Sequence, residues 1–106
     1  MKYYFVNTIL LLLSFVYTNA QYRFINYNVS DGLSQNSVHC IFQDRDGLIW
    51  IGTQDGLNSF DGKSFKKYRA NSLDSTTLSD QFVLSIEEDN NGSLWVGTRN
   101  GLNKLN

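Results

Sequence analysis

The sequence predicts an all-β fold of repeated antiparallel meanders, and three observations support this. One stretch of the chain recurs 45 residues further on without a gap, Asp-Gly and Asn-Gly pairs interrupt it at short intervals, and the segments between these pairs are short and apolar. Strands of about five to seven residues fit between such turns. A period of this size is typical of propeller blades and of helical arrays, and no helical periodicity is visible. We therefore expect four-stranded β-propeller blades.

The repeat is clearest when residues 44–61 are compared with residues 89–106. The positions that recur unchanged are Asp44, Gly47, Trp50, Gly52, Thr53, Gly56, Leu57 and Asn58, which are matched by Asp89, Gly92, Trp95, Gly97, Thr98, Gly101, Leu102 and Asn103. Upstream, Leu33, Ser34, Val38 and Ile41 are matched by Leu78, Ser79, Val83 and Ile86. The first repeat thus covers about residues 33–77 and the second about 78–106, which predicts about two blades of an incomplete propeller. Because repeat units usually need at least about three copies, we expect marginal folding or aggregation.

Asp-Gly and Asn-Gly pairs predict the hairpin turns of each blade. Asp46-Gly47 and Asn91-Gly92 are strong signals, because a two-residue turn that matches the strand twist needs positive φ, which Gly accepts freely and Asp or Asn accept best among the rest. Asp55-Gly56 and Asn100-Gly101 repeat the signal about nine residues later, and Asp61-Gly62 repeats it once more. Each blade is therefore predicted to be an antiparallel meander.

The tryptophan-containing segments predict sheets that are covered on both faces. Leu48–Ile51 and Leu94–Val96 are apolar without the alternation that a strand with one wet face would show. Each tryptophan would bury on the order of 200 Å2. Gly52 and Gly97 follow two residues after the tryptophans, where a missing side chain predicts a bulge or the close approach of a neighbouring sheet.

Residues 1–20 have the pattern of a secretory signal peptide, which would form a helix ahead of the propeller. Lys2 gives a basic start, Phe5–Val16 is apolar, and Thr18–Ala20 supplies small residues before a cut ahead of Gln21. The alternative is an uncleaved anchor, but the apolar run of about 12 residues is shorter than the roughly 20 that a spanning helix needs. We therefore expect a periplasmic or secreted protein that consists of residues 21–106.

The charge of the chain gives no sign of nucleic acid or an anionic membrane as a partner. Nine basic residues, all but Lys2 within residues 21–106, face ten acidic ones. A near-neutral balance provides no electrostatic surface for a polyanion. The local group of Lys63, Lys66, Lys67 and Arg69 alternates with aromatic residues and is better interpreted as a solvated edge strand than as a phosphate site.

The remaining segments are assigned in chain order. Tyr22–Tyr27 alternates and is predicted to be a strand, the last one of a preceding unit, which could pair with the final blade and join the two ends of a ring. Asp31–Ser34 is predicted to be a turn. Val38–Gln43 and Val83–Glu88 are the next strands, with a bulge or twist because their apolar residues differ in parity. Ala70–Thr77 is a polar surface loop or part of a ligand-facing rim.

Few side chains are candidates for chemistry. His39 and Cys40 are the only residues of their type, and their counterparts in the second repeat are Leu84 and Ser85. Packing is therefore favoured over a metal or base role for His39, and a small buried residue is favoured over a nucleophile for Cys40, which cannot form a disulfide within the chain. No catalytic, cofactor or metal site is predicted.

Two further sets of residues are candidates for binding sites. Asp44-x-Asp46-Gly47 suggests calcium, but the downstream Glu at the expected spacing is missing and the second copy replaces Asp46 with Asn91, so turn chemistry is the better interpretation. Positions that differ between the copies, such as Gln54 and Arg99, are the better candidates for ligand contacts.

Together these residues resemble the two-component regulator propeller repeat. The pattern in this sequence is Val38, Ile41, Asp44-x-x-Gly47-x-x-Trp50-Ile51-Gly52-Thr53-x-x-Gly56-Leu57-Asn58, Phe60-Asp61-Gly62, Phe65 and Tyr68, and the second copy matches as far as Asn106. The resemblance covers essentially all of residues 22–106. It implies the periplasmic sensor of a hybrid histidine kinase, of a class often tied to polysaccharide utilisation.

The resemblance also implies what surrounds this chain. The parent would be a membrane-anchored, dimeric sensor kinase whose further blades complete the propeller, and this chain would be its amino-terminal, non-catalytic piece. The ligand would be an unidentified molecule such as an oligosaccharide. The alternatives are a fragment of a propeller-type glycosidase or lyase, and a scaffold for protein–protein contacts. They differ in what would follow residue 106: a membrane helix and kinase motifs, a carboxylate pair in the channel, or neither.

Overall fold

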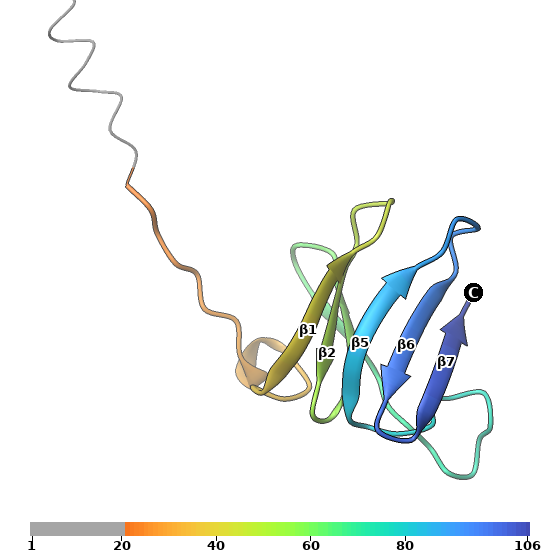
Figure 1. Cartoon of the computed structure of the whole chain (residues 1–106). Helices are drawn as coiled ribbons and strands as arrows, with labels where there is room; N and C mark the ends of the chain where they lie inside the picture. The colour runs from red at the N-terminus through yellow and green to blue at the C-terminus, as the bar shows by residue number, and fades with distance from the viewer. Residues whose placement is uncertain (1–20) are drawn as a thin grey trace, which may run out of the picture.

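The structure describes residues 21–106, and the predicted signal-peptide helix at residues 1–20 lies outside the described residues. In this computed structural model the chain forms two antiparallel sheets that lie side by side (Figure 1). The first sheet contains β1 (Val38–Gln43), β2 (Ile49–Thr53), β3 (Gly56–Phe60) and β4 (Phe65–Tyr68), in that order. The second contains β5 (Val83–Glu88), β6 (Leu94–Thr98) and β7 (Gly101–Leu105). The predicted all-β fold of meander blades is confirmed.

The core lies between the two sheets, where β5 packs against β1 and β2. Its buried members are Trp50 and Leu57 from the first sheet and Val83, Ile86, Leu94 and Val96 from the second. Every residue of β2 and β3 is buried or half-buried, which agrees with the lack of alternation, although within the described residues each sheet has one neighbouring sheet rather than two. The expected deep burial is confirmed for Trp50, which is 7% exposed, whereas Trp95 is only partly buried.

The two sheets approach each other closely at Gly52. A Cβ atom at this position would lie 2.5 Å from Cys40 Sγ and 2.5 Å from Val83 Cγ1, and no real Cβ tolerates such distances. At Gly97 a Cβ atom would meet only Ser85, which belongs to the same sheet as Gly97. The close approach of a neighbouring sheet predicted from the sequence is therefore confirmed at Gly52 only.

Each innermost strand contains the predicted irregularity. In β1 the register shifts between Val38, which pairs with Thr53, and Cys40, which pairs with Gly52. The same shift separates Val83 from Ser85 in β5. An extra residue at this point reverses the parity of the strand, which allows Val83 and Ile86 both to reach the core although they are three residues apart.

The first turn of each blade is longer than the two-residue hairpin predicted from Asp46-Gly47. The Gly47 N–H donates to the Asp44 carbonyl at 3.0 Å, and the Asp44 N–H donates to the Leu48 carbonyl at 3.0 Å. Gly47 has a φ of 90°, but none of the described non-glycine residues has positive φ, so the prediction of positive φ was wrong for Asp46 and likewise for the Asp or Asn of the other pairs, Asp55, Asp61, Asn91 and Asn100. The Asp44 side chain holds this wider turn, as described below.

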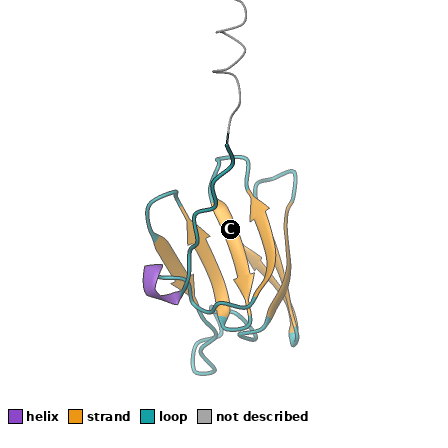
Figure 2. Cartoon of the chain, turned by 90° about the vertical axis from the view of Figure 1, so that its left-hand side faces the viewer, coloured by secondary structure: helices purple, strands orange, loops and turns teal. Residues whose placement is uncertain are grey.

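The amino-terminal segment differs from its prediction. Tyr22–Tyr27 was expected to be a strand but has no strand pairing, and Phe24 is fully exposed. An isolated extended segment has no partner for its backbone groups, so it cannot form part of a sheet by itself. The predicted turn that follows is a short 3-10 helix, Val29–Asp31 (purple in Figure 2), which Asn28 caps and Gly32 ends. None of the helices in the described part of the chain is long and apolar enough to cross a membrane.

Candidate functional site

The repeated aspartate of each blade is a structural residue of the first turn. Asp44 Oδ1 accepts hydrogen bonds from the backbone N–H groups of Asp46 and Leu48, and Asp44 Oδ2 accepts one from Trp50 Nε1 at 2.9 Å. Both carboxylate oxygens are therefore committed to N–H donors of the same turn. Turn chemistry, the interpretation favoured over calcium, is confirmed, and residues 21–106 contain no group of three or more His, Cys, Asp or Glu side chains that could hold a metal ion.

The second blade repeats this arrangement around Asp89. Asp89 Oδ2 accepts a hydrogen bond from Trp95 Nε1 at 2.9 Å, and Oδ1 accepts from the backbone N–H groups of Asn91 and Ser93. Hydrogen bonds to the ionised form favour it. The indole N–H of Trp95 first, and then the Ser93 N–H, lower the pKa of the Asp89 carboxyl from its ordinary value.

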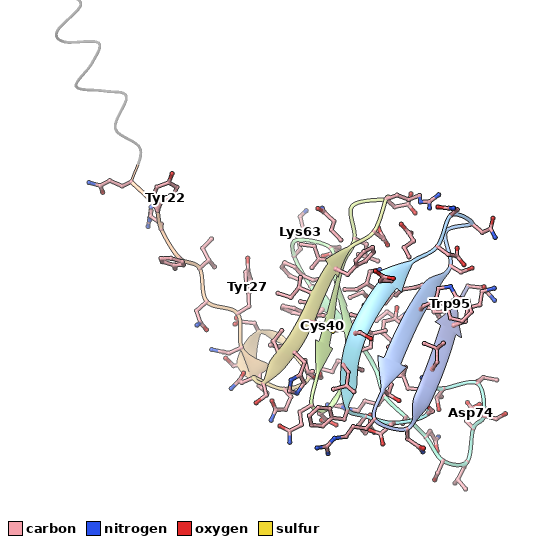
Figure 3. The ribbon with its side chains drawn as sticks, in the orientation of Figure 1. Tyr22, Tyr27, Cys40, Lys63, Asp74 and Trp95 are labelled. Atoms are coloured by element: carbon pink, nitrogen blue, oxygen red, sulfur yellow. The ribbon has the colours of Figure 1, made fainter. Side chains whose placement is uncertain are left out.

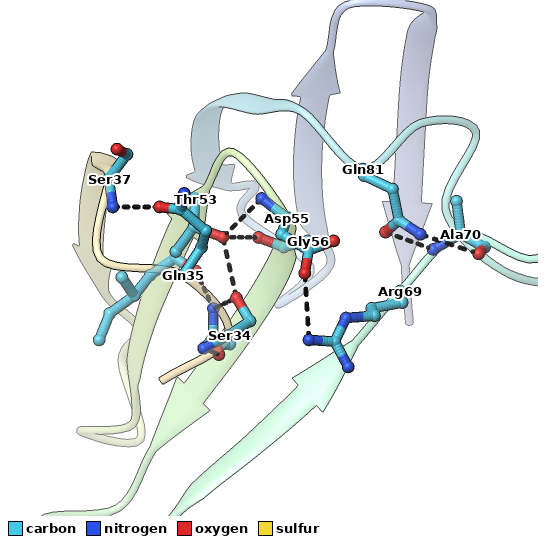
Figure 4. A network of polar contacts seen from close by, with 11 residues as sticks. Ser34, Gln35, Ser37, Thr53, Asp55, Gly56, Arg69, Ala70 and Gln81 are labelled. Carbon is cyan, nitrogen blue, oxygen red and sulfur yellow. Dashed lines mark hydrogen bonds and ion pairs between the residues drawn. The ribbon is translucent and has the colours of Figure 1, made fainter. Parts of the chain in front are cut away.

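A second repeated network joins the segment before each inner strand to the next turn. Asn58 Oδ1 accepts from the Ser34 N–H at 3.0 Å and its Nδ2 donates to Ser34 Oγ at 2.8 Å, while the Ser34 and Thr53 hydroxyls are 2.8 Å apart. Figure 4 shows Ser34 and Thr53 at the centre of this network. The equivalent residues of the second blade, Ser79, Thr98 and Asn103, make the same contacts. The polar residues that repeat thus hold the fold together.

Residues that differ between the blades meet at the end of the molecule where β1 and β5 begin, at the bottom of Figure 1. The His39 ring stacks on the Phe82 ring with centroids 4.5 Å apart and planes 25° apart. The Arg99 guanidinium carbon lies 4.0 Å from the Phe82 centroid. We call His39, Phe82 and Arg99 the rim stack. Because His39 is the second residue of β1 and the other two residues belong to the second repeat, the rim stack spans the joint between the blades.

The backbone positions Arg99 over the aromatic ring. The Arg99 N–H donates to the Phe82 carbonyl at 3.1 Å, which places the turn between β6 and β7 beside the segment that enters β5. The equivalent bond in the first blade runs from the Gln54 N–H to the Ser37 carbonyl at 3.2 Å. Gln54 therefore occupies the position that matches Arg99. Its neighbour is Ser37, which has no aromatic ring, whereas the neighbour of Arg99 is Phe82, and Gln54 takes no part in the rim stack.

The structure places the candidate residues named from the sequence in different surroundings. Arg99, proposed for ligand contact, lies in the rim stack, and His39 packs as predicted but does so on Phe82 at an exposed position. Cys40 is half-buried against Gly52 (Figure 3), and burial raises the pKa of its thiol. Phe82 was missed. Its signal was present in the sequence, since an aromatic residue replaces the matched Ser37.

The joint that carries the rim stack is held by hydrogen bonds at both of its ends. At the far end, Arg45 Nε lies 3.3 Å from Glu88 Oε1, and Arg45 Nη2 donates to the Asp89 carbonyl at 2.6 Å. At the near end, the Gly56 N–H donates to the Gln81 carbonyl at 2.6 Å. These bonds limit rotation of one blade against the other, so the three side chains of the rim stack keep a defined spacing.

The basic residues on and beside the outer strand have different surroundings. Lys66 and Lys67 are exposed on β4, an edge strand, and Lys66 Nζ lies 5.2 Å from the centre of the Tyr68 ring. Arg69 Nη2 is 3.1 Å from Asp55 Oδ2 (Figure 4), and Lys63 lies on a separate turn (Figure 3). The charges are thus spread along the strand, as expected of a solvated edge.

A groove of about 610 Å3 opens between the outer strands of the two sheets. Leu57 and Tyr68 line one side, Val96 and Leu102 line the other, and the loop at residues 75–78 closes one end. The lining also includes Lys67, Arg69 and Lys104 and the hydroxyl side chains of residues 75–77, so the groove combines apolar and basic groups. The rim stack differs from the groove in that its three side chains are held against one another across the joint.

Comparisons with known proteins agree with this architecture. The sequence model described as the two component regulator propeller matches residues 32–55 and 77–100, one segment in each blade. A protein named Histidine kinase P4, from Formosa agariphila, is 53% identical over 61 residues, which are 58% of this chain and 4% of that protein.

A solved structure is similar in both sequence and fold. It is described as the extracellular domain of the hybrid two component system BT3049 from B. thetaiotaomicron, and it superposes with a TM-score of 0.70 at 31% identity. The match covers 76% of this chain and 11% of that one, so this chain spans a small part of both relatives. The two matched segments and the two meander sheets show that each blade of this chain contains a two-component regulator propeller repeat.

Proposed function

We propose that this chain is a ligand-recognition segment of a periplasmic two-component sensor, that it has no catalytic role, and that its ligand is a carbohydrate. The observation that carries the proposal is the rim stack. The repeated polar residues satisfy one another within each blade, whereas His39, Phe82 and Arg99 differ from their counterparts and lie together at one end. The side chains of these three residues take no part in the repeated hydrogen-bond networks of the blades, and they lie at a defined position, so they are available for recognition.

The chemistry of the rim stack suits a sugar that carries an acidic group. Arg99 is exposed, and within the described residues its guanidinium forms no ion pair or side-chain hydrogen bond. A guanidinium offers five N–H donors in a planar arrangement. It can bind one carboxylate through two parallel hydrogen bonds, and it also donates to hydroxyl groups. Stacking on Phe82 leaves the edge of the guanidinium open while it restricts the side chain, which reduces the entropy lost on binding.

The position of the rim stack supports a signalling role. A ligand that touches both His39 and Arg99 bridges the two blades and would bind best at one angle between them. A ligand shifts a conformational equilibrium only through its different affinities for the two states. A ligand that contacts both blades would have different affinities for the two states, because the distance between its contacts changes with the angle between the blades. A ligand that contacts a single blade would not.

Binding is tested with the full chain by isothermal titration calorimetry against uronate-containing and neutral oligosaccharides. We expect uronate-containing ligands to bind, and Arg99→Ala to weaken them by roughly tenfold or more, since a charge-assisted hydrogen bond contributes about 1.5–3 kcal/mol. Lys63→Ala, an exposed cation on a different turn, is the matched control and should bind as the unchanged chain does. Equal losses in both variants, or no binding, would overturn the assignment of the site.

Two further measurements test the remaining parts of the proposal. Formation of new reducing ends or unsaturated sugars during incubation would contradict the non-catalytic role. Export is checked by fractionation and by amino-terminal sequencing, which should find Gln21 as the first residue. A chain that stays in the cytoplasm with residues 1–20 attached would contradict the periplasmic assignment.

A further inference from the structure

The segment that connects the two blades carries one side chain that pairs with the backbone of another segment. The Ala70 N–H donates to Gln81 Oε1 at 3.0 Å, and Gln81 Nε2 donates to the Ala70 carbonyl at 3.2 Å. These two bonds reproduce the exchange of N–H and C=O bonds between opposite residues of an antiparallel sheet. Gln81 thereby anchors the start of the loop at residues 71–77 to the segment that enters β5.

Gln81 also holds the first blade through its own backbone. The Gly56 N–H donates to the Gln81 carbonyl at 2.6 Å. Asp55 Oδ2 lies 3.1 Å from Nη2 of Arg69, the residue before Ala70. Non-covalent contacts and peptide bonds thus form a closed circuit, which Figure 4 shows, through Gln81, Ala70, Arg69, Asp55 and Gly56. Members of such a network support one another, so removal of one contact loosens the others.

This circuit lies next to the aromatic ring of the rim stack. Phe82 follows Gln81, its N–H donates to Asp80 Oδ1 at 2.7 Å, and its carbonyl accepts the Arg99 N–H at 3.1 Å. The backbone of Phe82 is therefore held on both sides, and this backbone sets the direction in which the ring projects. The Arg99 guanidinium carbon, 4.0 Å from the ring centre, and the His39 ring, at 4.5 Å, depend on the same direction.

The first repeat has a different arrangement at the matched positions. The residue that matches Gln81 is Asn36, and its Oδ1 accepts a hydrogen bond from the Val29 N–H at 3.0 Å, which among the described residues is the one bond of that side chain. The residue that matches Phe82 is Ser37. The two-bond anchor and the aromatic ring therefore occur together, in the repeat that contributes Phe82 and Arg99 to the rim stack.

The loop at residues 71–77 is a compact unit that Gln81 attaches to the blades. The Asn71 N–H donates to Thr77 Oγ1 at 2.9 Å, and Thr77 Oγ1 donates to the Asp74 carbonyl at 2.9 Å. Within residues 21–106, the hydrogen bonds of residues 71–77 all stay inside the loop. The loop can therefore shift as a unit, and the pair of bonds between Ala70 and Gln81 is the contact through which such a shift reaches Phe82.

We propose that Gln81 is a positioning residue of the rim stack, which links the loop at residues 71–77 to the Phe82 ring and so sets where the Arg99 guanidinium meets a ligand. The inference rests on the proposed function, since it concerns how the same site is held and regulated. Coupling between two sites is reciprocal. A ligand that fixes Arg99 therefore also fixes the loop, and displacement of the loop weakens ligand binding.

NMR spectroscopy of the full chain without ligand tests the positioning role. The Phe82 ring shields protons over its face, so the Arg99 side-chain protons should resonate upfield in the unchanged chain. In Gln81→Ala this upfield shift should largely disappear, and hydrogen exchange of the Ala70 N–H should accelerate roughly fivefold or more, because the N–H loses its acceptor. The matched control is Gln43→Ala, which removes a bond from Gln43 Nε2 to the Gly47 carbonyl of the same 3.2 Å length at the other end of the joint and should change neither signal. Unchanged Arg99 resonances in Gln81→Ala would overturn the proposal.

Gln81→Glu tests the anchor with a side chain of the same size. Its carboxylate still accepts from the Ala70 N–H, but it can donate to the Ala70 carbonyl only when protonated, which for an ordinary glutamate occurs near about pH 4.3. The upfield shift of Arg99 should therefore be reduced at neutral pH and should recover as the pH falls toward that value, relative to the unchanged chain at each pH. A full upfield shift at neutral pH would overturn the positioning role. So would an unfolded Gln81→Glu chain in circular dichroism, since Gln81 would then serve general stability.

Calorimetry with uronate-containing oligosaccharides separates this inference from the proposed function. Gln81→Ala should weaken binding by roughly threefold or more, and the ligand should slow exchange of the Ala70 N–H in the unchanged chain. Equal binding by Gln81→Ala and the unchanged chain would overturn the positioning role and leave the proposed function intact. Absence of binding by the unchanged chain would overturn the proposed function, while the spectra without ligand would still decide whether Gln81 positions the ring.

Discussion

The two sheets have matching residues at the repeated positions and in the same register, yet these residues are buried to very different extents. Gly52 pairs with Leu57 in the first sheet as Gly97 pairs with Leu102 in the second. Leu57 is 2% exposed and Leu102 is 66% exposed. The difference arises from what lies against each sheet, because β5 covers the first sheet and no described strand covers the second. Burial in this fold is therefore a property of the joint rather than of the single blade.

The hydrogen bonds of the two sheets do not differ in this way. The bond from the tryptophan Nε1 to the aspartate is 2.9 Å in both blades, and the Ser–Thr–Asn network recurs in both. These bonds join residues within one repeat, so each blade can form them alone. The comparison thus separates local polar contacts, which every repeat has, from apolar contacts, which need a neighbour.

Replacement of the two tryptophans gives the largest expected effect. Trp50→Ala should lower the free energy of unfolding by about 3–5 kcal/mol, as for other fully buried aromatic residues. Trp95→Ala should cost less than half as much, because its ring is only partly covered. Both variants lose the same hydrogen bond to an aspartate. The difference between their losses in free energy of unfolding therefore measures how much burial against the neighbouring sheet contributes. The measurement is urea unfolding at concentrations where the chain is monomeric, and equal costs would contradict the comparison.

The two glycines after the tryptophans should show a smaller contrast. Gly52→Ala forces a Cβ atom into Cys40 and Val83 and should cost about 1–3 kcal/mol, as other overpacking changes do. In Gly97→Ala the new atom meets the Ser85 hydroxyl, which can rotate away, so the cost should stay below about 1 kcal/mol. Thermal unfolding of the two variants side by side measures the contrast. A more severe loss at Gly97 would show that the second sheet is also covered.

The ion pair between Arg45 and Glu88, which crosses the joint, should contribute still less to the free energy of unfolding. The Arg45 side chain is 54% exposed where it meets Glu88, so Arg45→Ala should lower the free energy of unfolding by no more than about 1 kcal/mol. High salt should reduce this loss, because salt screens exposed pairs. Lys66→Ala removes an exposed cation that pairs with no carboxylate among the described residues and is the matched control. A loss several times larger would mean that this ion pair, rather than apolar burial, holds the blades together.

The smallest effect is expected at low pH. The folded state holds the pKa of Asp89 below its ordinary value, first through the Trp95 indole N–H. The stability that this provides is complete above the unfolded pKa of about 3.9 and is lost as the pH falls through the folded pKa. Trp95→Phe should move the folded pKa of Asp89 back up, whereas Trp50→Phe should leave it unchanged. Carboxyl titration by NMR measures both, and an unaltered Asp89 in Trp95→Phe would contradict the assigned cause.

Much of the fold could be predicted from particular residues. The repeat of Asp44, Trp50 and Thr53 as Asp89, Trp95 and Thr98 predicted two meander blades, and Gly52 predicted a close approach. Arg99 was a candidate because it differs from Gln54. The prediction for Tyr22–Tyr27 failed because alternation is typical of a strand but does not supply the partner that a strand needs. Phe82 was missed because its role depends on His39, which is far from it in sequence.

What the sequence by itself determined about this protein is the blade: its turns, its register, its bulge and the hydrogen bonds that tie Asp44 to Trp50 and Ser34 to Asn58. These contacts join residues of a single repeat, 6 residues apart for Asp44 and Trp50 and 24 residues apart for Ser34 and Asn58, so the repeat unit by itself specifies them. Only the tertiary structure decided which blade faces are covered and which side chains meet at the rim. Such contacts join residues of different repeats. Because identical residues stand at matched positions, the sequence gives the same expectation for both copies and does not indicate which copy is covered by a neighbour.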